Sequence, residues 1–111
     1  MEREWRARKN PSYDAVCFHA QQCAEKYLKG RLAEAEIAFD KTHALVHLLK
    51  QALPLEPAWE IFREDLGRLT VFAVMFRYPG VSADKETARD AVCRCREFRR
   101  VARASLGLPA R

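Results

Sequence analysis

The chain has 111 residues, of which 49% are hydrophobic, so it is long enough for one compact domain with a buried core. No stretch reaches the roughly 18 apolar residues of a membrane span, and the charged N-terminal segment lacks the apolar core of a secretory signal, so we expect a cytoplasmic protein. The formal net charge of +5 favours a polyanion or an acidic protein as the partner.

A long amphipathic helix is the first predicted element. Residues 1–12 form a basic lead-in, and Ser12 is the expected N-cap of a helix over residues 13–36. The helix has an apolar stripe rich in small residues, which let another helix approach closely: Val16, Ala20, Cys23, Ala24, Tyr27 and Leu28. Polar side chains gather around the same turns: His19, Gln21, Gln22 and Lys26.

Two further helices are expected after a loop at residues 37–41. Thr42 is the expected N-cap of a short helix over residues 43–53, with a buried face formed by Leu45, Leu48, Leu49 and Ala52. A third helix is expected over residues 57–77, because large apolar residues recur there every three or four positions. The turn Tyr78-Pro79-Gly80 ends it.

A fourth helix is expected over residues 83–106, with Ser82 as its N-cap and Gly107 just after its C-terminus. Its inward face is formed by Ala88, Ala91, Val92, Cys95, Phe98 and Ala102. No stretch alternates with the period of a strand. The sequence therefore predicts an all-α, four-helix, up-and-down-like bundle over residues 13–108, with residues 109–111 as a tail.

Three blocks of this sequence resemble one known family. HAQQ followed by CAEKYLK at residues 19–29, THALVHLL at residues 42–49 and FRYPG at residues 76–80 are similar to motifs of the HEPN family (higher eukaryote and prokaryote nucleotide-binding domains), in the family's order. The resemblance covers residues 13–108. It implies a helical domain that forms homodimers, in a family that includes ribonucleases, toxin components and inactive binding modules.

Arg77 and Tyr78 are the first candidates for ligand binding. An arginine offers a planar fork that matches phosphate, and here it stands beside a rigid turn. The alternative is an arginine that caps the carbonyls at a helix C-terminus. The ribonuclease branch of the family uses an R-x(4–6)-H motif near this point, but no histidine follows His47 in this chain, which puts RNA cleavage in doubt.

The histidines are the next candidates. His43 and His47 stand four residues apart, a spacing that can chelate a metal on a helix, but further ligands are not obvious and we predict no metal and no cofactor. The alternative is that His43 hydrogen-bonds a neighbouring helix. His19 is either a ligand-binding residue or an interior histidine in contact with the fourth helix.

Two polar groups complete the set of candidates. Gln21, Gln22 and Lys26 either bind a base or a phosphate, or tie the first helix to its neighbours. An arginine stripe on the fourth helix either follows a nucleic-acid backbone, docks an acidic protein or is simply solvated: Arg89, Arg96, Arg100 and Arg103. The four cysteines form no C-x-x-C pair and are expected to be free thiols.

Three functional hypotheses remain open. The first is a homodimeric module that binds a nucleotide or RNA and engages a minimal nucleotidyltransferase, as in the toxin–antitoxin-type pairs of this family. The second is a metal-independent ribonuclease with a divergent site, in which Arg77 contacts the phosphate and His43 or His19 transfers the proton. The third is a purely structural helical dimer that no ligand stabilises.

Overall fold

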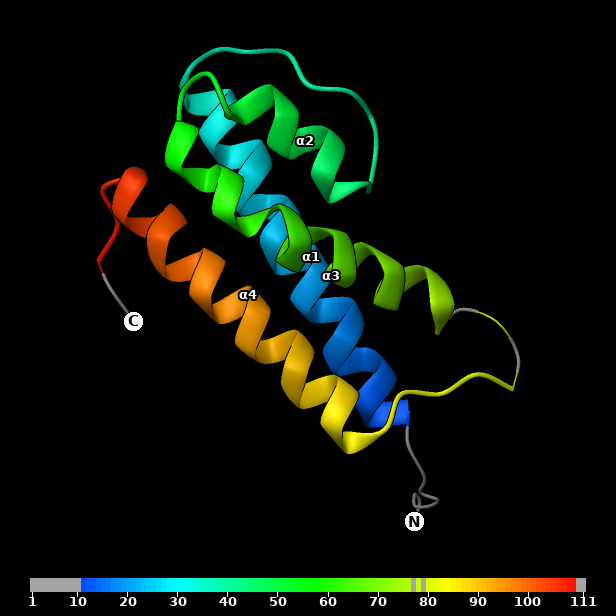
Figure 1. The fold of residues 1–111 in the computed structure, drawn as a ribbon. Helices are drawn as coiled ribbons and strands as arrows, with labels where there is room; N and C mark the ends of the chain where they lie inside the picture. Colours follow the sequence, from blue (N-terminus) through cyan, green and yellow to red (C-terminus); the bar gives the residue numbers. More distant parts are fainter. Residues whose placement is uncertain (1–10, 77, 79, 110–111) are drawn as a thin grey trace.

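The computed structural model describes residues 11–76, 78 and 80–109. Over these residues the chain forms four α-helices and one 3₁₀ helix: α1 (Pro11–Glu34), α2 (Leu45–Ala52), η1 (Pro57–Phe62), α3 (Arg63–Met75) and α4 (Lys85–Ser105). No strand occurs in this part of the chain. The predicted all-α bundle is therefore confirmed (Figure 1).

The two longest helices, α1 and α4, lie side by side along the molecule and form its most extensive interface (Figure 1). Two hydrogen bonds show that they run in the same direction. Near their N-termini Asp14 Oδ1 accepts from the Ala83 amide at 2.6 Å, and towards their C-termini Arg103 Nη1 donates to Tyr27 Oη at 2.9 Å. The loop between α1 and α2 carries the chain back along the bundle, and α3 then runs opposite to α1 and α4. The helix directions therefore do not alternate along the chain, as the up-and-down-like prediction required.

The core lies where α1 meets the other helices. Small buried side chains on both helices let α1 and α4 approach closely: Ala20, Ala24, Ala88, Ala91 and Ala102. The predicted face of α2 is confirmed, because Leu45, Leu48, Leu49 and Ala52 are all fully buried. The buried face of α1 is wider than the predicted stripe, because α1 contacts α2 and α3 as well as α4. It also includes Cys17, Gln21, Glu25 and Leu32.

The third predicted helix is divided in two. Residues 57–62 wind as the 3₁₀ helix η1 and only then does α3 begin. In a 3₁₀ helix residues three apart stand on the same side. Trp59 and Phe62 therefore both meet Phe98 of α4 edge-on, with ring centroids 5.1 and 5.3 Å from it.

Each predicted N-cap is displaced. Helix α1 begins at Pro11, so Ser12 lies inside it. Helix α2 begins at Leu45 and not at His43, because Thr42 Oγ1 accepts from the Ala44 amide in a tight turn and the Leu45 amide donates to Thr70 of α3. Before α4, Asp84 replaces Ser82 as the cap, and its carboxylate accepts from the Thr87 amide at 2.8 Å.

Two helices end in the same left-handed cap. Gly107 follows α4 with φ +74°, and the Leu108 amide donates to the Arg103 carbonyl at 2.8 Å, so this predicted cap is confirmed. After α1 the same position is held by Glu36, with φ +59°, and the Ile37 amide donates to the Leu32 carbonyl. Among the helices that the structure describes, none has both the length and the apolar character that a membrane span requires.

Candidate functional site

A pocket of about 390 Å³ opens between α1, the start of α2 and α3. It is called the amide pocket here and is lined by Phe18, Gln21, Gln22, His43, Ala44, Thr70, Ala73 and Val74. The polar part of the lining, called the polar wall here, includes Gln21, Gln22 and His43, and the apolar part, called the apolar wall, includes Phe18, Ala73 and Val74. A volume of this size, with a few converging polar groups on an apolar lining, is typical of small-molecule sites.

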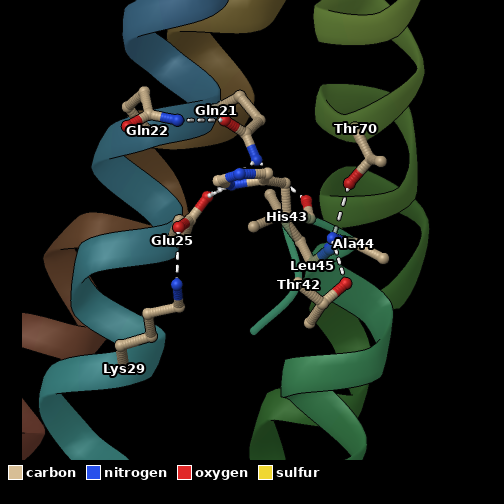
Figure 2. Close-up of polar contacts among 9 residues, drawn as sticks. All are labelled: Gln21, Gln22, Glu25, Lys29, Thr42, His43, Ala44, Leu45 and Thr70. Atoms are coloured by element: carbon tan, nitrogen blue, oxygen red, sulfur yellow. Dashed lines mark hydrogen bonds and ion pairs between the residues drawn. The ribbon is translucent and has the colours of Figure 1, made fainter. Parts of the chain in front are cut away.

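The polar wall is organised by the backbone of residue 43. Gln21 is buried, and its Nε2 donates to the His43 carbonyl at 2.9 Å. Gln22 Nε2 donates in turn to Gln21 Oε1 at 3.0 Å, as Figure 2 shows. The two amides are therefore held in fixed orientations, and the segment that leads into α2 is anchored to α1.

Glu25 lies one turn beyond Gln21 on the same face of α1 and is the buried carboxylate of this cluster. Its Oε1 accepts from Gln21 at 3.2 Å and lies 2.9 Å from His43 Nδ1, while its Oε2 accepts from Lys29 Nζ at 2.8 Å (Figure 2). Burial opposes ionisation of the carboxyl, but its three hydrogen-bond donors outweigh that cost and hold the pKa of Glu25 below its ordinary value.

This carboxylate determines which nitrogen of the neutral imidazole carries the proton. An ionised carboxylate can only accept, so the proton of the neutral His43 ring stands on Nδ1 and Nε2 is left as an acceptor. The His43 side chain is otherwise exposed. A carboxylate–imidazole pair with one free ring nitrogen can bind a hydrogen-bond donor or move a proton.

The structure corrects the reading of the other two histidines. His43 precedes α2, so it shares no helical face with His47, whose Nε2 is paired with Asp40. No group of three or more metal-ligating side chains forms among residues 11–76, 78 and 80–109. His19 is exposed and not interior, and it stands at the edge of a groove between α1 and α4.

The remaining candidates fall on different surfaces. Gln22 lines the amide pocket, whereas Lys26, one turn further along α1, is exposed and does not line it. Arg77 lies outside the described residues, and Tyr78 is 62% exposed. In the arginine stripe, Arg89, Arg96 and Arg100 are exposed. Arg103 departs from the predicted stripe, because it is half-buried and held by Tyr27 and the Pro109 carbonyl.

Three residues of the site were missed from the sequence. Glu25 was overlooked because a glutamate in a run of helix formers is usually solvated, although its i,i+4 spacing to both Gln21 and Lys29 was a usable signal. Thr70 Oγ1, which accepts from the Leu45 amide at 3.1 Å, comes from α3. Phe18 is an exposed aromatic residue of α1 and lies outside the apolar periodicity from which the helix was predicted.

Comparison with known protein families gives one match. The family model described as "HEPN domain" matches residues 5–105, nearly the whole chain. No curated protein matches the chain, and no solved structure does.

Proposed function

The chain belongs to the HEPN domain family, and on that premise we propose that it is a binding module whose amide pocket takes the base of a nucleotide or of single-stranded RNA. The observation that carries the proposal is the pairing, in one pocket, of an ordered amide–imidazole wall with an exposed aromatic ring. A nucleobase needs both, because it has polar edges and a flat apolar face.

The polar wall offers groups for the edge of a base. Gln22 donates to Gln21, and its carbonyl oxygen accepts no hydrogen bond from any residue that the structure describes. His43 Nε2 is an acceptor beside it, for the reason given above. These two atoms suit the amino and ring N–H groups of a base. Both N–H groups of the Gln21 amide donate within the cluster, and its oxygen accepts from Gln22.

The apolar wall offers a face for stacking. Phe18 is 42% exposed and lines both the amide pocket and an adjoining hollow that contains Phe76. Arg77 follows Phe76 in the chain, so in this proposal its guanidinium and the Tyr78 hydroxyl bind the phosphate of a base stacked on Phe18. The basic balance of the chain favours such an anion.

The family resemblance extends the proposal to protein partners. In this extended proposal the chain acts as a homodimer and pairs with a minimal nucleotidyltransferase in a toxin–antitoxin-type system. The pairing is tested by co-expression with a minimal nucleotidyltransferase from the same genome and isolation of a complex of defined stoichiometry. Recovery of the two proteins separately would contradict it.

Binding is tested by titration of the protein with the four nucleoside monophosphates and a fluorescent single-stranded RNA decamer. We expect at least one probe to saturate, and Phe18→Ala to weaken it about tenfold, because base–aromatic stacking contributes about 1–3 kcal/mol. Ile61→Ala is the matched control, since Ile61 is 77% exposed on η1 and lies outside the pocket.

Two results would contradict the base-binding proposal. One is the absence of saturable binding by every probe, which would favour a purely structural helical dimer. The other is an equal loss in the Phe18→Ala and Ile61→Ala variants, which would show that the effect does not arise in the pocket.

The Glu25–His43 pair favours a second candidate function, a metal-independent ribonuclease. His43 would act as the proton acceptor and Arg77 would contact the scissile phosphate. The test is incubation of structured RNA with the protein in EDTA. This candidate requires that His43→Ala and Arg77→Ala abolish cleavage while His47→Ala, which changes an exposed histidine paired elsewhere, retains it. No cleavage by the parent protein would exclude it.

A further inference from the structure

A second cavity, called the α1–α4 groove here, runs between those two helices and has a volume of about 310 Å³. It shares no lining residue with the amide pocket. Its apolar lining consists of Val16, Ala20, Val92 and Cys95, and its polar lining of His19, Arg96 and Arg99. A volume of this size is at the lower end of the range for small-molecule sites.

The apolar floor of the groove suits an aliphatic chain. Ala20 and Cys95 are each 7% exposed, and Val16 and Val92 are half-buried. Among the residues that the structure describes, no aromatic side chain lines the groove, so it lacks the flat surface on which a base would stack. An aliphatic chain needs no such surface, because burial of its CH₂ groups is favourable against any apolar floor.

The edge of the groove carries positive charge that the described residues do not neutralise. Arg96 is exposed and Arg99 is half-buried. Neither has a carboxylate within ion-pair distance in the part of the chain that the structure describes. Glu97, which stands next to Arg96 in the chain, pairs with Arg100 at 3.2 Å. Two cations at the edge of an apolar floor attract a small anion.

The apolar and cationic residues follow one another in a regular order along α4. Each apolar lining residue is followed four positions later by an arginine of the groove: Val92 by Arg96 and Cys95 by Arg99. Residues four apart lie on the same face of a helix, so an aliphatic chain on the floor ends beside the two guanidinium groups. A second copy of this chain, related by a two-fold axis, would place like charges against each other and is disfavoured as the occupant.

We propose that the α1–α4 groove binds a small amphipathic anion, an aliphatic chain that ends in a carboxylate or a phosphate. The chain lies on the apolar floor, and the oxygens of the anionic head accept hydrogen bonds from Arg96 and Arg99, whose planar guanidinium groups match either head. The proposal does not rest on base binding in the amide pocket, because the two cavities share no residue.

The test is a titration of the isotope-labelled protein with octanoate and with octyl phosphate, followed by NMR at the amides of Ala20 and Val92. We expect at least one of the two anions to shift both amides saturably, and the one with the higher affinity identifies the head. Octanol, which has the same chain and no charge, should bind about tenfold more weakly, because hydrogen bonds to a charged group are the stronger ones. Butyrate, with a shorter chain, should also bind about tenfold more weakly than octanoate.

Paired variants locate the charge effect. Arg96→Gln and Arg99→Gln should each weaken the tighter anion about tenfold and leave the affinity for octanol unchanged. Arg89→Gln, at an exposed position of α4 outside the groove, is the matched control and should have no effect. Phe18→Ala, which alters the amide pocket, should also leave the affinity for the anion unchanged, so the test separates the two cavities.

Three results would overturn the proposal. The first is the absence of saturable shifts at the groove amides with both anions. The second is an affinity for octanol equal to that for the anions, which would remove the role of the arginines. The third is an equal loss of affinity in the Arg89→Gln and Arg99→Gln variants, which would show a general effect of charge and not a site.

Discussion

Glu25 is the residue on which the geometry of the amide pocket depends. Its carboxylate orients the His43 ring, accepts from Gln21 and is itself held by Lys29. Because Glu25 and Gln21 are both buried, removal of the carboxylate leaves the Gln21 N–H donor facing a site that solvent reaches poorly. An unsatisfied donor of this kind costs about 1–3 kcal/mol.

We therefore predict that Glu25→Met destabilises the protein by about 1–3 kcal/mol at pH 7 in urea unfolding. The folded pKa of Glu25 is lowered, so its contribution is present above the unfolded pKa and is lost as pH falls through the folded value. The difference between parent and variant should shrink at pH 3.5. Glu64→Met, at an exposed position of α3, is the control and should change stability by less than about 0.5 kcal/mol. Equal destabilisation by Glu25→Met at both pH values would contradict the stabilising role of the ionised Glu25 carboxylate.

The sequence predicted some residues of the site but grouped them incorrectly. The polar residues of α1 were treated as one cluster because they are near in sequence: His19, Gln21, Gln22 and Lys26. Each step along a helix turns the side chain by about 100°, so neighbours in sequence face different partners. Gln21 and Gln22 reach the amide pocket towards α2 and α3, whereas His19 faces the α1–α4 groove. Which neighbour each face of α1 meets depends on where the other helices pack, and the sequence of α1 alone does not give those positions.

At the scale of elements, the positions of the helices were predictable, as was the Gly107 cap after α4, but the N-termini were not. Periodic apolar residues give the position of a helix, and this signal was clear for α2 and α4. Where a helix begins depends on which of several nearby residues makes the capping hydrogen bond. Thr42 was a reasonable cap, but α2 begins later because the Leu45 amide is satisfied by Thr70, which is distant in sequence. Such tertiary partners leave no local signal.

One hydrogen bond joins α1 to the segment that leads into α4. Asp14 Oδ1 accepts from the amide of Ala83, which is itself buried, at 2.6 Å. We predict that Asp14→Ala lowers stability by about 1.5–3 kcal/mol, the usual value of a hydrogen bond to a charged group, and that Asp14→Asn loses less because an acceptor remains. Amide exchange at Ala83, followed by NMR, should accelerate in the alanine variant. Unchanged exchange there would show that the amide is protected by burial alone.

At the scale of the whole molecule, an apolar patch adjoins the amide pocket. Phe18, Val71, Val74 and Met75 are 42%, 50%, 49% and 40% exposed. The three residues of α3 lie on one face of that helix, and Phe18 and Val74 line the pocket itself. A second copy related by a two-fold axis would cover the patch with the same patch and close the open side of the pocket.

We predict that the protein is a homodimer through this patch and that Val74→Glu converts it to a monomer. A two-fold interface would bring both new carboxylates into a desolvated apolar contact, where neither finds a partner. Sedimentation equilibrium measures the change, with Ile61→Glu as the control because Ile61 is exposed and apolar but lies on η1. If the partner copy closes the pocket, nucleotide affinity should fall in Val74→Glu and stay unchanged in Ile61→Glu. A parent protein that stays monomeric at micromolar concentration, or a dimer that survives Val74→Glu, would contradict a homodimer formed through this face.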